Sequence, residues 1–156
     1  MKNSHKSFLI SIFVIYCAVL IMILFVRYGR EFGFSIYSIK ERLNENGNLV
    51  PFRTIRNYIA ALKNGNISSV VVKYNLIGNF LLFMPMGFML PELCKNRGFI
   101  ITSARILSLI ILVETVQLIT GLGSLDIDDV ILNLSGSLIG YTICYLKTKL
   151  INQNHQ

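Results

Sequence analysis

Four stretches of the chain are apolar over lengths that suit a helix crossing a lipid bilayer. Residues 8–26 carry no charge and match the roughly 20 residues that a helix needs to cross the hydrocarbon core. Residues 74–90, 99–120 and 130–146 follow, and each of these stretches contains polar side chains. Polar groups are tolerated in a membrane only where they face other helices or a wet cavity. We therefore expect the last three helices to pack around a polar interior and the first helix to face lipid.

An amphipathic pattern lies in the long loop between the first two apolar stretches. Ile55, Tyr58, Ile59 and Leu62 recur at helical spacing and predict a short helix with one apolar side. A turn should precede it, because Pro51 has no backbone N–H to donate and pushes the residue before it toward an extended conformation. Two placements stay open for this helix, which would lie on the membrane surface or pack against the protein's own helices.

These patterns predict an all-α integral membrane protein, a bundle of about four transmembrane helices with a short amphipathic helix in the first loop. Composition agrees, because 53% of the 156 residues are hydrophobic and 15% are charged, whereas about a quarter are charged in soluble domains. We divide the chain into an N-terminal anchor with the start of a basic loop, a domain of the amphipathic helix and three transmembrane helices, and a short polar tail. Their bounds are residues 1–47, 48–146 and 147–156.

The net charge of +7 bears on partners and on orientation. Lys and Arg are scattered along helix ends and the first loop without a basic stripe among aromatic residues, which argues against nucleic acid. Attraction to anionic lipids, about 1 kcal/mol per basic residue near the surface, accounts for the charge. The loop at residues 121–125 and the acids after it lack basic residues, so we expect this loop outside and both termini in the cytoplasm, as in a multi-pass protein of the cell membrane.

Two of the polar groups sit inside the predicted spans. Asn79 shares a helix face with Asn75 and precedes Pro85, which should bend the span. Asn79 either holds helices together by hydrogen bonds or lines a polar pocket that the bend opens. Glu114 and Gln117 share a face near the middle of the third stretch. An ionised group at the bilayer centre costs about 3 to more than 10 kcal/mol, so Glu114 needs a partner from another helix or a function.

A third polar group begins the last span. Asp126, Asp129 and Asn133 form one stripe of a helix, and Asp128 points off that stripe. Helix starts favour such acids as an N-cap and near the positive end of the helix dipole. Together with Glu114, the stripe could instead bind a divalent cation, a cationic headgroup or a proton. The candidate functional cluster comprises Asn79, Glu114, Gln117, Asp126, Asp129 and Asn133.

Metal and cofactor sites are not expected. No His joins the acids, and the three cysteines have no metal or redox spacing. Gly136 and Gly140 instead provide a small-residue face for close helix packing, on the same side of the last span as the acidic stripe.

Four short motifs, taken in order, resemble the VanZ family over residues 48–145. They are Asn48-Leu-x-Pro51-Phe52, Asn79-x-x-x-Phe83-x-Pro85-x-Gly87, Glu114-x-x-Gln117 and Asp126-Ile-x-Asp129-Val-Ile-x-Asn133-x-x-Gly136-x-x-x-Gly140. The resemblance implies a small multi-helix membrane protein. The family's namesake is associated with low-level resistance to teicoplanin, a glycopeptide antibiotic with a lipid tail. No reaction is implied, so activity as an enzyme stays undecided.

Three functions stay open, ranked as follows. The first is a VanZ-like envelope protein that lowers susceptibility to lipid-tailed glycopeptides by interacting with the antibiotic's anchor or with a lipid-linked cell-wall precursor. The second is a non-catalytic membrane scaffold or subunit. The third is a membrane-embedded enzyme acting on a lipid headgroup or a lipid-linked cell-wall precursor, with Glu114, Asp126 and Asp129 as acid, base or cation ligands. It ranks last, because no nucleophile, His or phosphate-binding loop accompanies the acids.

Overall fold

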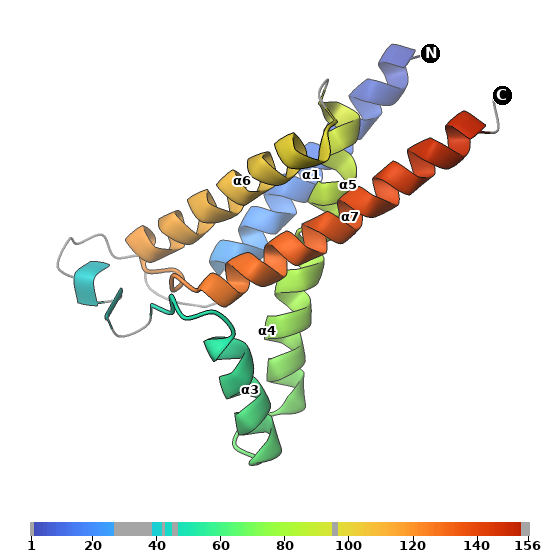
Figure 1. The fold of residues 1–156 in the computed structure, drawn as a ribbon. Helices are drawn as coiled ribbons and strands as arrows, with labels where there is room; N and C mark the ends of the chain where they lie inside the picture. Colours follow the sequence, from blue (N-terminus) through green and yellow to red (C-terminus); the bar gives the residue numbers. More distant parts are fainter. Residues whose placement is uncertain (1, 27–38, 42, 45–46, 95–96, 154–156) are drawn as a thin grey trace.

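The structure, a computed structural model, describes residues 2–26, 39–41, 43–44, 47–94 and 97–153. Helices make up most of it, and within these residues strand pairing is limited to one isolated bridge between Asn48 and Asp126 (Figure 1). The helices are α1 (Lys2–Val26), α3 (Arg53–Lys63), α4 (Ser69–Leu82), α5 (Met84–Leu93), α6 (Phe99–Thr120) and α7 (Ile127–Gln153).

Four helical segments in the described chain are long and apolar enough to cross a membrane, as predicted. Their bounds are Lys6–Phe25, Ser69–Leu93, Phe99–Thr120 and Ile127–Gln153. The second and fourth extend beyond the predicted 74–90 and 130–146, because a helix keeps its backbone hydrogen bonds after the apolar run ends. The first turn of α1 and the last turn of α7 lie at the same end of the bundle (Figure 1). The assignment of that end to the cytoplasm stays a prediction.

The second span is broken between α4 and α5 at Phe83, two residues before Pro85. Pro85 lacks the N–H that would bond to the carbonyl of Leu81, so the helical ladder cannot run through this point. Tyr16 of α1 lies beside the break, where its hydroxyl donates a hydrogen bond of 2.6 Å to the carbonyl oxygen of Leu82. The break therefore redirects the chain and gives α1 a polar contact with the bundle.

The crossing of α4 and α5 over α7 is a contact between backbones. A Cβ atom added at Gly136 would lie 1.7 Å from the carbonyl oxygen of Phe80, and one at Gly140 would lie 2.0 Å from that of Met84. A Cβ atom at Gly87 would lie 1.8 Å from the carbonyl oxygen of Ser137. Only glycine fits at these positions, and their small size brings the polar side chains of α4 and α7 within reach of one another.

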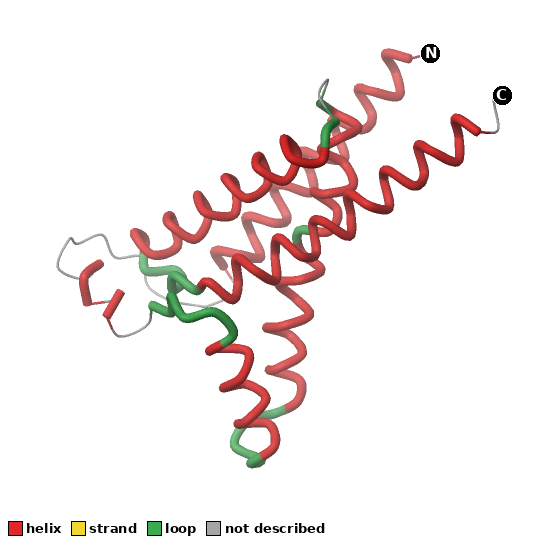
Figure 2. The backbone as a smooth tube through the Cα atoms, in the orientation of Figure 1, coloured by secondary structure: helices red, strands yellow, loops and turns green. Residues whose placement is uncertain are grey.

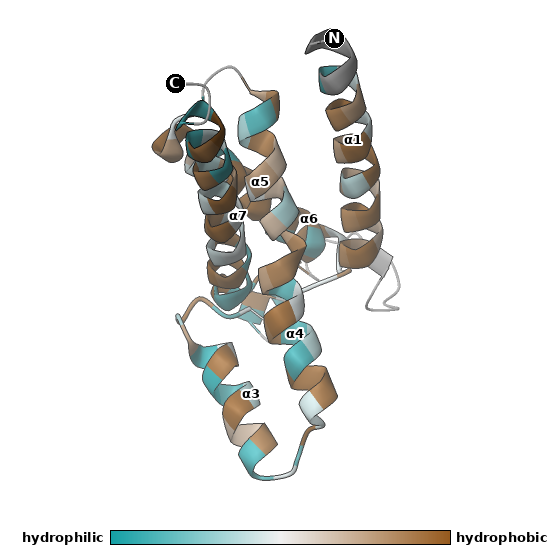
Figure 3. Ribbon diagram, turned by 90° about the vertical axis from the view of Figure 1, so that its right-hand side faces the viewer, coloured by the Kyte–Doolittle hydropathy of each residue, from teal (hydrophilic) through white to brown (hydrophobic). Residues whose placement is uncertain are grey.

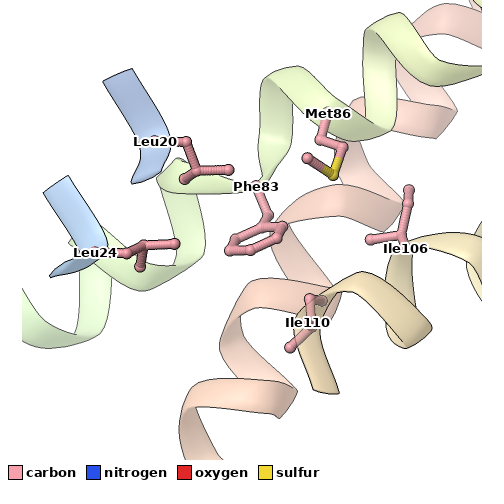
Figure 4. Packing of buried hydrophobic residues seen from close by; sticks show 6 residues of the cluster. All are labelled: Leu20, Leu24, Phe83, Met86, Ile106 and Ile110. Carbon is pink, nitrogen blue, oxygen red and sulfur yellow. The ribbon is translucent and has the colours of Figure 1, made fainter. Parts of the chain in front are cut away.

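A small hydrophobic cluster joins α1 to α6, to α5 and to the junction of α4 with α5 (Figure 4). Beyond these contacts the spanning part of α1, Lys6–Phe25, is mostly apolar (Figure 3), and only 11% of its most apolar window is buried. This agrees with the expectation that the first helix faces lipid more than the others do. The six residues of the cluster are Leu20, Leu24, Phe83, Met86, Ile106 and Ile110.

The amphipathic helix α3 runs beside the first part of α4, and the two project from the other helices at one end of the molecule (Figures 1 and 3). No residue of α3 is buried. Ile55 and Tyr58 are partly covered, whereas Ile59 and Leu62 are exposed. The helix thus contacts α4 without burying its apolar side, and the choice between the two placements stays a prediction.

Candidate functional site

The loops that precede α3 and α7 meet at the N-terminal end of α7 (Figure 2). We call residues 48–55 the strap. The backbone N–H of Asn48 donates to the carbonyl of Leu125, and the N–H of Ile127 donates to the carbonyl of Asn48, both at 2.8 Å. The strap is thereby held against the turn between α6 and α7. Gly121 begins that turn with a φ of 75°, a left-handed conformation that ends α6.

Asp126 is the N-cap of α7 and also binds the strap. Its Oδ1 accepts a 2.8 Å hydrogen bond from the N–H of Asp128, which satisfies a free donor of the first helical turn. The same oxygen accepts a 2.9 Å bond from the side-chain amide of Asn48, and Oδ2 accepts a 2.6 Å bond from the hydroxyl of Thr54. Both oxygens of this buried carboxylate are thus used in holding the fold.

Asp128 is fully buried and caps α3 from outside that helix. Phe52, the N-cap residue of α3, has no polar side-chain atom and a φ of 64°. The Asp128 carboxylate takes the place of a cap, because Oδ1 accepts a hydrogen bond from the N–H of Phe52 and Oδ2 accepts one of 3.1 Å from the N–H of Ile55. The sequence pattern set Asp128 apart from the acidic stripe and missed this role. An amphipathic helix without its own Ser, Thr, Asp or Asn cap was the available signal.

The remaining polar residues surround a cavity of about 20 Å³ that lies between α4, α6 and α7. We call it the inner cavity. Asn79 comes from α4, Glu114 and Gln117 come from α6, and Asp129 and Asn133 come from α7. The structure thus brings together five of the six residues of the predicted cluster, all except Asp126. Its lining residues are Leu24, Asn79, Glu114, Gln117, Gly123, Ser124, Asp129 and Asn133.

Hydrogen bonds around the inner cavity leave two acceptors poorly satisfied. The amide of Asn79 donates to Asp129, and that of Gln117 donates to the carbonyl of Leu24 at 3.0 Å. The carboxyl group of Glu114, 3% exposed, accepts a long 3.5 Å contact from the N–H of Asp126. The side-chain oxygen of Asn133 is buried and has no hydrogen-bond partner within the described chain.

A second, outer cavity of about 140 Å³ lies beside the first and shares Ser124 and Asp129 with it. It is enclosed by the strap, α3, α4 and α7. Its lining residues are Thr54, Tyr58, Asn75, Leu76, Ser124, Asp126, Asp128, Asp129 and Leu132. The two cavities together form a polar region that begins at the strap and ends at Glu114 and Asn133.

The six motif residues outside the polar cluster lie where the backbone turns or where two helices cross. Pro51 and Phe52 lie in the strap, and Pro85 is in the first turn of α5. The glycines at positions 87, 136 and 140 form the helix crossing. In the described residues, no group of three or more His, Cys, Asp or Glu is placed to hold a metal ion.

These features define a multi-pass α-helical membrane protein whose polar site is built from three of its spanning helices. The sequence model of the family described as VanZ/LLP1 matches residues 13–148, and the chain belongs to this family. The chain is similar to Protein VanZ of Enterococcus faecium, with 36% identity over 78 residues. That match spans about half the length of each protein, 50% of this chain and 48% of the relative. No solved structure matches the chain.

Proposed function

We propose that this protein lowers the susceptibility of its cell to teicoplanin and other lipid-tailed glycopeptides by acting within the membrane of the cell envelope. The observation that carries the proposal is the VanZ/LLP1 match, which extends over residues 13–148 and so includes the strap, both cavities and the helix crossing. The buried carboxyl and amide groups support a role beyond packing, because ionisable side chains within a membrane are costly and are usually functional.

A lipid-tailed partner is supported by an apolar groove on the surface of α1 and α4. The groove measures about 260 Å³ and is lined by Ile23, Tyr74, Gly78, Leu81 and Leu82. Leu24 and Asn79, which line the inner cavity, follow the groove residues Ile23 and Gly78 in the chain. We propose that the groove receives the acyl chain of the antibiotic or of a lipid-linked cell-wall precursor, while the polar part of that molecule approaches the cavities.

The test is susceptibility of a glycopeptide-sensitive Gram-positive host that expresses the chain. We expect a higher inhibitory concentration of teicoplanin and a smaller change for vancomycin, which lacks the lipid tail. Glu114→Gln and Asp129→Asn should each abolish the protection at equal membrane abundance. Glu92→Gln is the matched control, because Glu92 is also a carboxylate in a spanning segment but pairs with Lys147, with 3.3 Å between Oε1 and Nζ.

Unchanged susceptibility with the wild-type protein present in the membrane would contradict the proposal. A second result, protection that both site variants retain, would contradict the role of the two carboxyl groups alone. The second result would favour a scaffold, a role that the strap network supports because Asp126 and Asp128 are engaged in hydrogen bonds that hold the fold. In a scaffold, Glu114→Gln would change stability alone.

A further inference from the structure

The inner cavity contains buried acceptors that lack donors. Asn133 is 3% exposed, and its side-chain oxygen has no partner in the described part of the chain. Glu114 is equally buried and accepts only the 3.5 Å contact from the Asp126 amide among the hydrogen bonds of the described residues. An unsatisfied buried acceptor costs about 1–3 kcal/mol, and more when it is charged. Such a pair of acceptors indicates a ligand that supplies donors or positive charge.

Two of the side-chain amides at the cavity already donate to other groups of the protein. The amide of Asn79 is used on Asp129, and that of Gln117 is used on the backbone carbonyl of Leu24. The described lining includes two carboxyl groups and contains no Lys, Arg or His. Apart from the Ser124 hydroxyl and the remaining amide N–H groups, an anion would meet two carboxyl groups and no basic side chain. A cation would instead satisfy the free oxygen of Asn133 and interact favourably with the two carboxyl groups.

Size and ligand number restrict the cation. A volume of about 20 Å³ corresponds to about one water-sized probe, so the site admits an ion but no organic group of any length. Carboxylate and amide oxygens are ligands for hard cations. Within the described residues the site has two acids and no third His, Cys, Asp or Glu placed with them, so it offers few ligands for a divalent ion, and magnesium in particular gives up its water reluctantly. By ligand number, the site therefore suits an alkali ion better.

We propose that the inner cavity binds a free monovalent metal cation between the carboxyl groups of Glu114 and Asp129 and the side-chain oxygen of Asn133. The outer cavity provides the route, because it shares Ser124 and Asp129 with the inner one. The bound ion would neutralise charge in the membrane and link α6 to α7. Its connection with antibiotic susceptibility rests on the proposed function, whereas binding itself does not.

The first test is thermal unfolding of the full-length protein in detergent micelles. Sodium, potassium and lithium chlorides are compared with choline chloride at constant ionic strength, because choline is too large for the cavity. A ligand that binds only the folded state raises the unfolding temperature as its concentration passes the dissociation constant. We expect at least one alkali ion to do so, and Glu114→Gln and Asn133→Leu to weaken the apparent affinity tenfold or more.

Two variants separate ion binding from general stability. Asn133→Asp keeps an oxygen acceptor and should retain the response, and Glu92→Gln should leave it unchanged. Sodium-23 NMR of the wild-type protein covers the case in which the cavity variants fail to fold. Broadening of the sodium resonance by the protein, reversed by excess lithium or potassium, would support binding of an alkali ion at the site.

Equal unfolding temperatures in alkali and choline salts, without sodium broadening, would overturn the inference and leave a water-filled cavity. An undiminished response in Glu114→Gln and Asn133→Leu would overturn it as well. Two further results would overturn the inference. One is a rise in unfolding temperature with magnesium but with no alkali ion. The other is a higher unfolding temperature in nanodiscs of phosphatidylethanolamine than in nanodiscs of phosphatidylcholine, without any effect of alkali ions. Ion binding without protection against teicoplanin would refute the proposed function alone, and protection without ion binding would refute this inference alone.

Discussion

Asp128 offers the sharpest test of how the strap and α3 are held. Its carboxylate accepts hydrogen bonds from the N–H groups of Phe52 and Ile55, and the side chain is fully buried. Hydrogen bonds to charged groups contribute about 1.5–3 kcal/mol each. Asp128→Asn preserves the shape but removes the charge and turns an NH₂ group toward one of the two donors. Losing one bond and weakening the other should cost about 3 kcal/mol.

Hydrogen–deuterium exchange of the purified protein in detergent measures this loss where it occurs. Because about 1.4 kcal/mol corresponds to a factor of ten, exchange in peptides from residues 48–63 should accelerate about a hundredfold in Asp128→Asn. Peptides from α6 should keep their rates. Glu92→Gln controls for removal of a carboxylate, because Glu92 pairs with Lys147 rather than with the strap.

Unchanged exchange over residues 48–63 would refute the reasoning. It would mean that the ladder between Asn48 and the turn before α7 holds the strap without Asp128. A uniform acceleration over the whole chain would also count against it, because that result signals global destabilisation instead of the loss of a helix cap.

Two further substitutions test the helix contacts, both by the free energy of unfolding in mixed micelles. Gly136→Ala places a Cβ atom 1.7 Å from the carbonyl oxygen of Phe80 and should lower the free energy of unfolding by about 1–3 kcal/mol as α4 and α7 separate. The neighbouring Ser135→Ala should lower it less. Equal effects of the two substitutions would contradict the close backbone contact at Gly136. Tyr16→Phe removes the 2.6 Å bond to Leu82 and should cost about 0.6–1.7 kcal/mol; a variant as stable as the wild type would show that the bond contributes nothing.

The sequence predicted the spanning helices well because length and apolar content are local properties. Residues 99–120 coincide with α6, since Gly98 and Gly121 flank the apolar run on both sides. The second and fourth spans were predicted too short, because helical hydrogen bonding continues into polar residues such as Lys73 and Lys147. The position of α3 beside α4 depends on tertiary contacts, which no local pattern contains.

The same contrast between local pattern and tertiary contact applies to the residues of the candidate site. Asn79, Glu114, Gln117, Asp129 and Asn133 could be selected because each is polar within an apolar helix and shares a face with another polar residue. The N-cap role of Asp126 was also predicted and is confirmed. The bonds of Asp126 and Asp128 to the strap could not be predicted, because these partners lie more than 70 residues earlier in the chain. Spacing along a helix assigns a face to a side chain, but it does not tell which group that face meets.

The hydrogen bonds of the acidic residues indicate where a ligand can bind. Asp126 accepts hydrogen bonds on both oxygens and Asp128 accepts two backbone N–H groups, so a ligand at either would have to displace bonds that hold α3 and α7. Glu114 and Asn133 have no such role in the described structure, because one accepts a single long contact and the other's oxygen accepts none. A ligand gains most where its bonds replace none of the protein's own. The inner cavity, rather than the acids at the strap, is therefore the place where function should be sought.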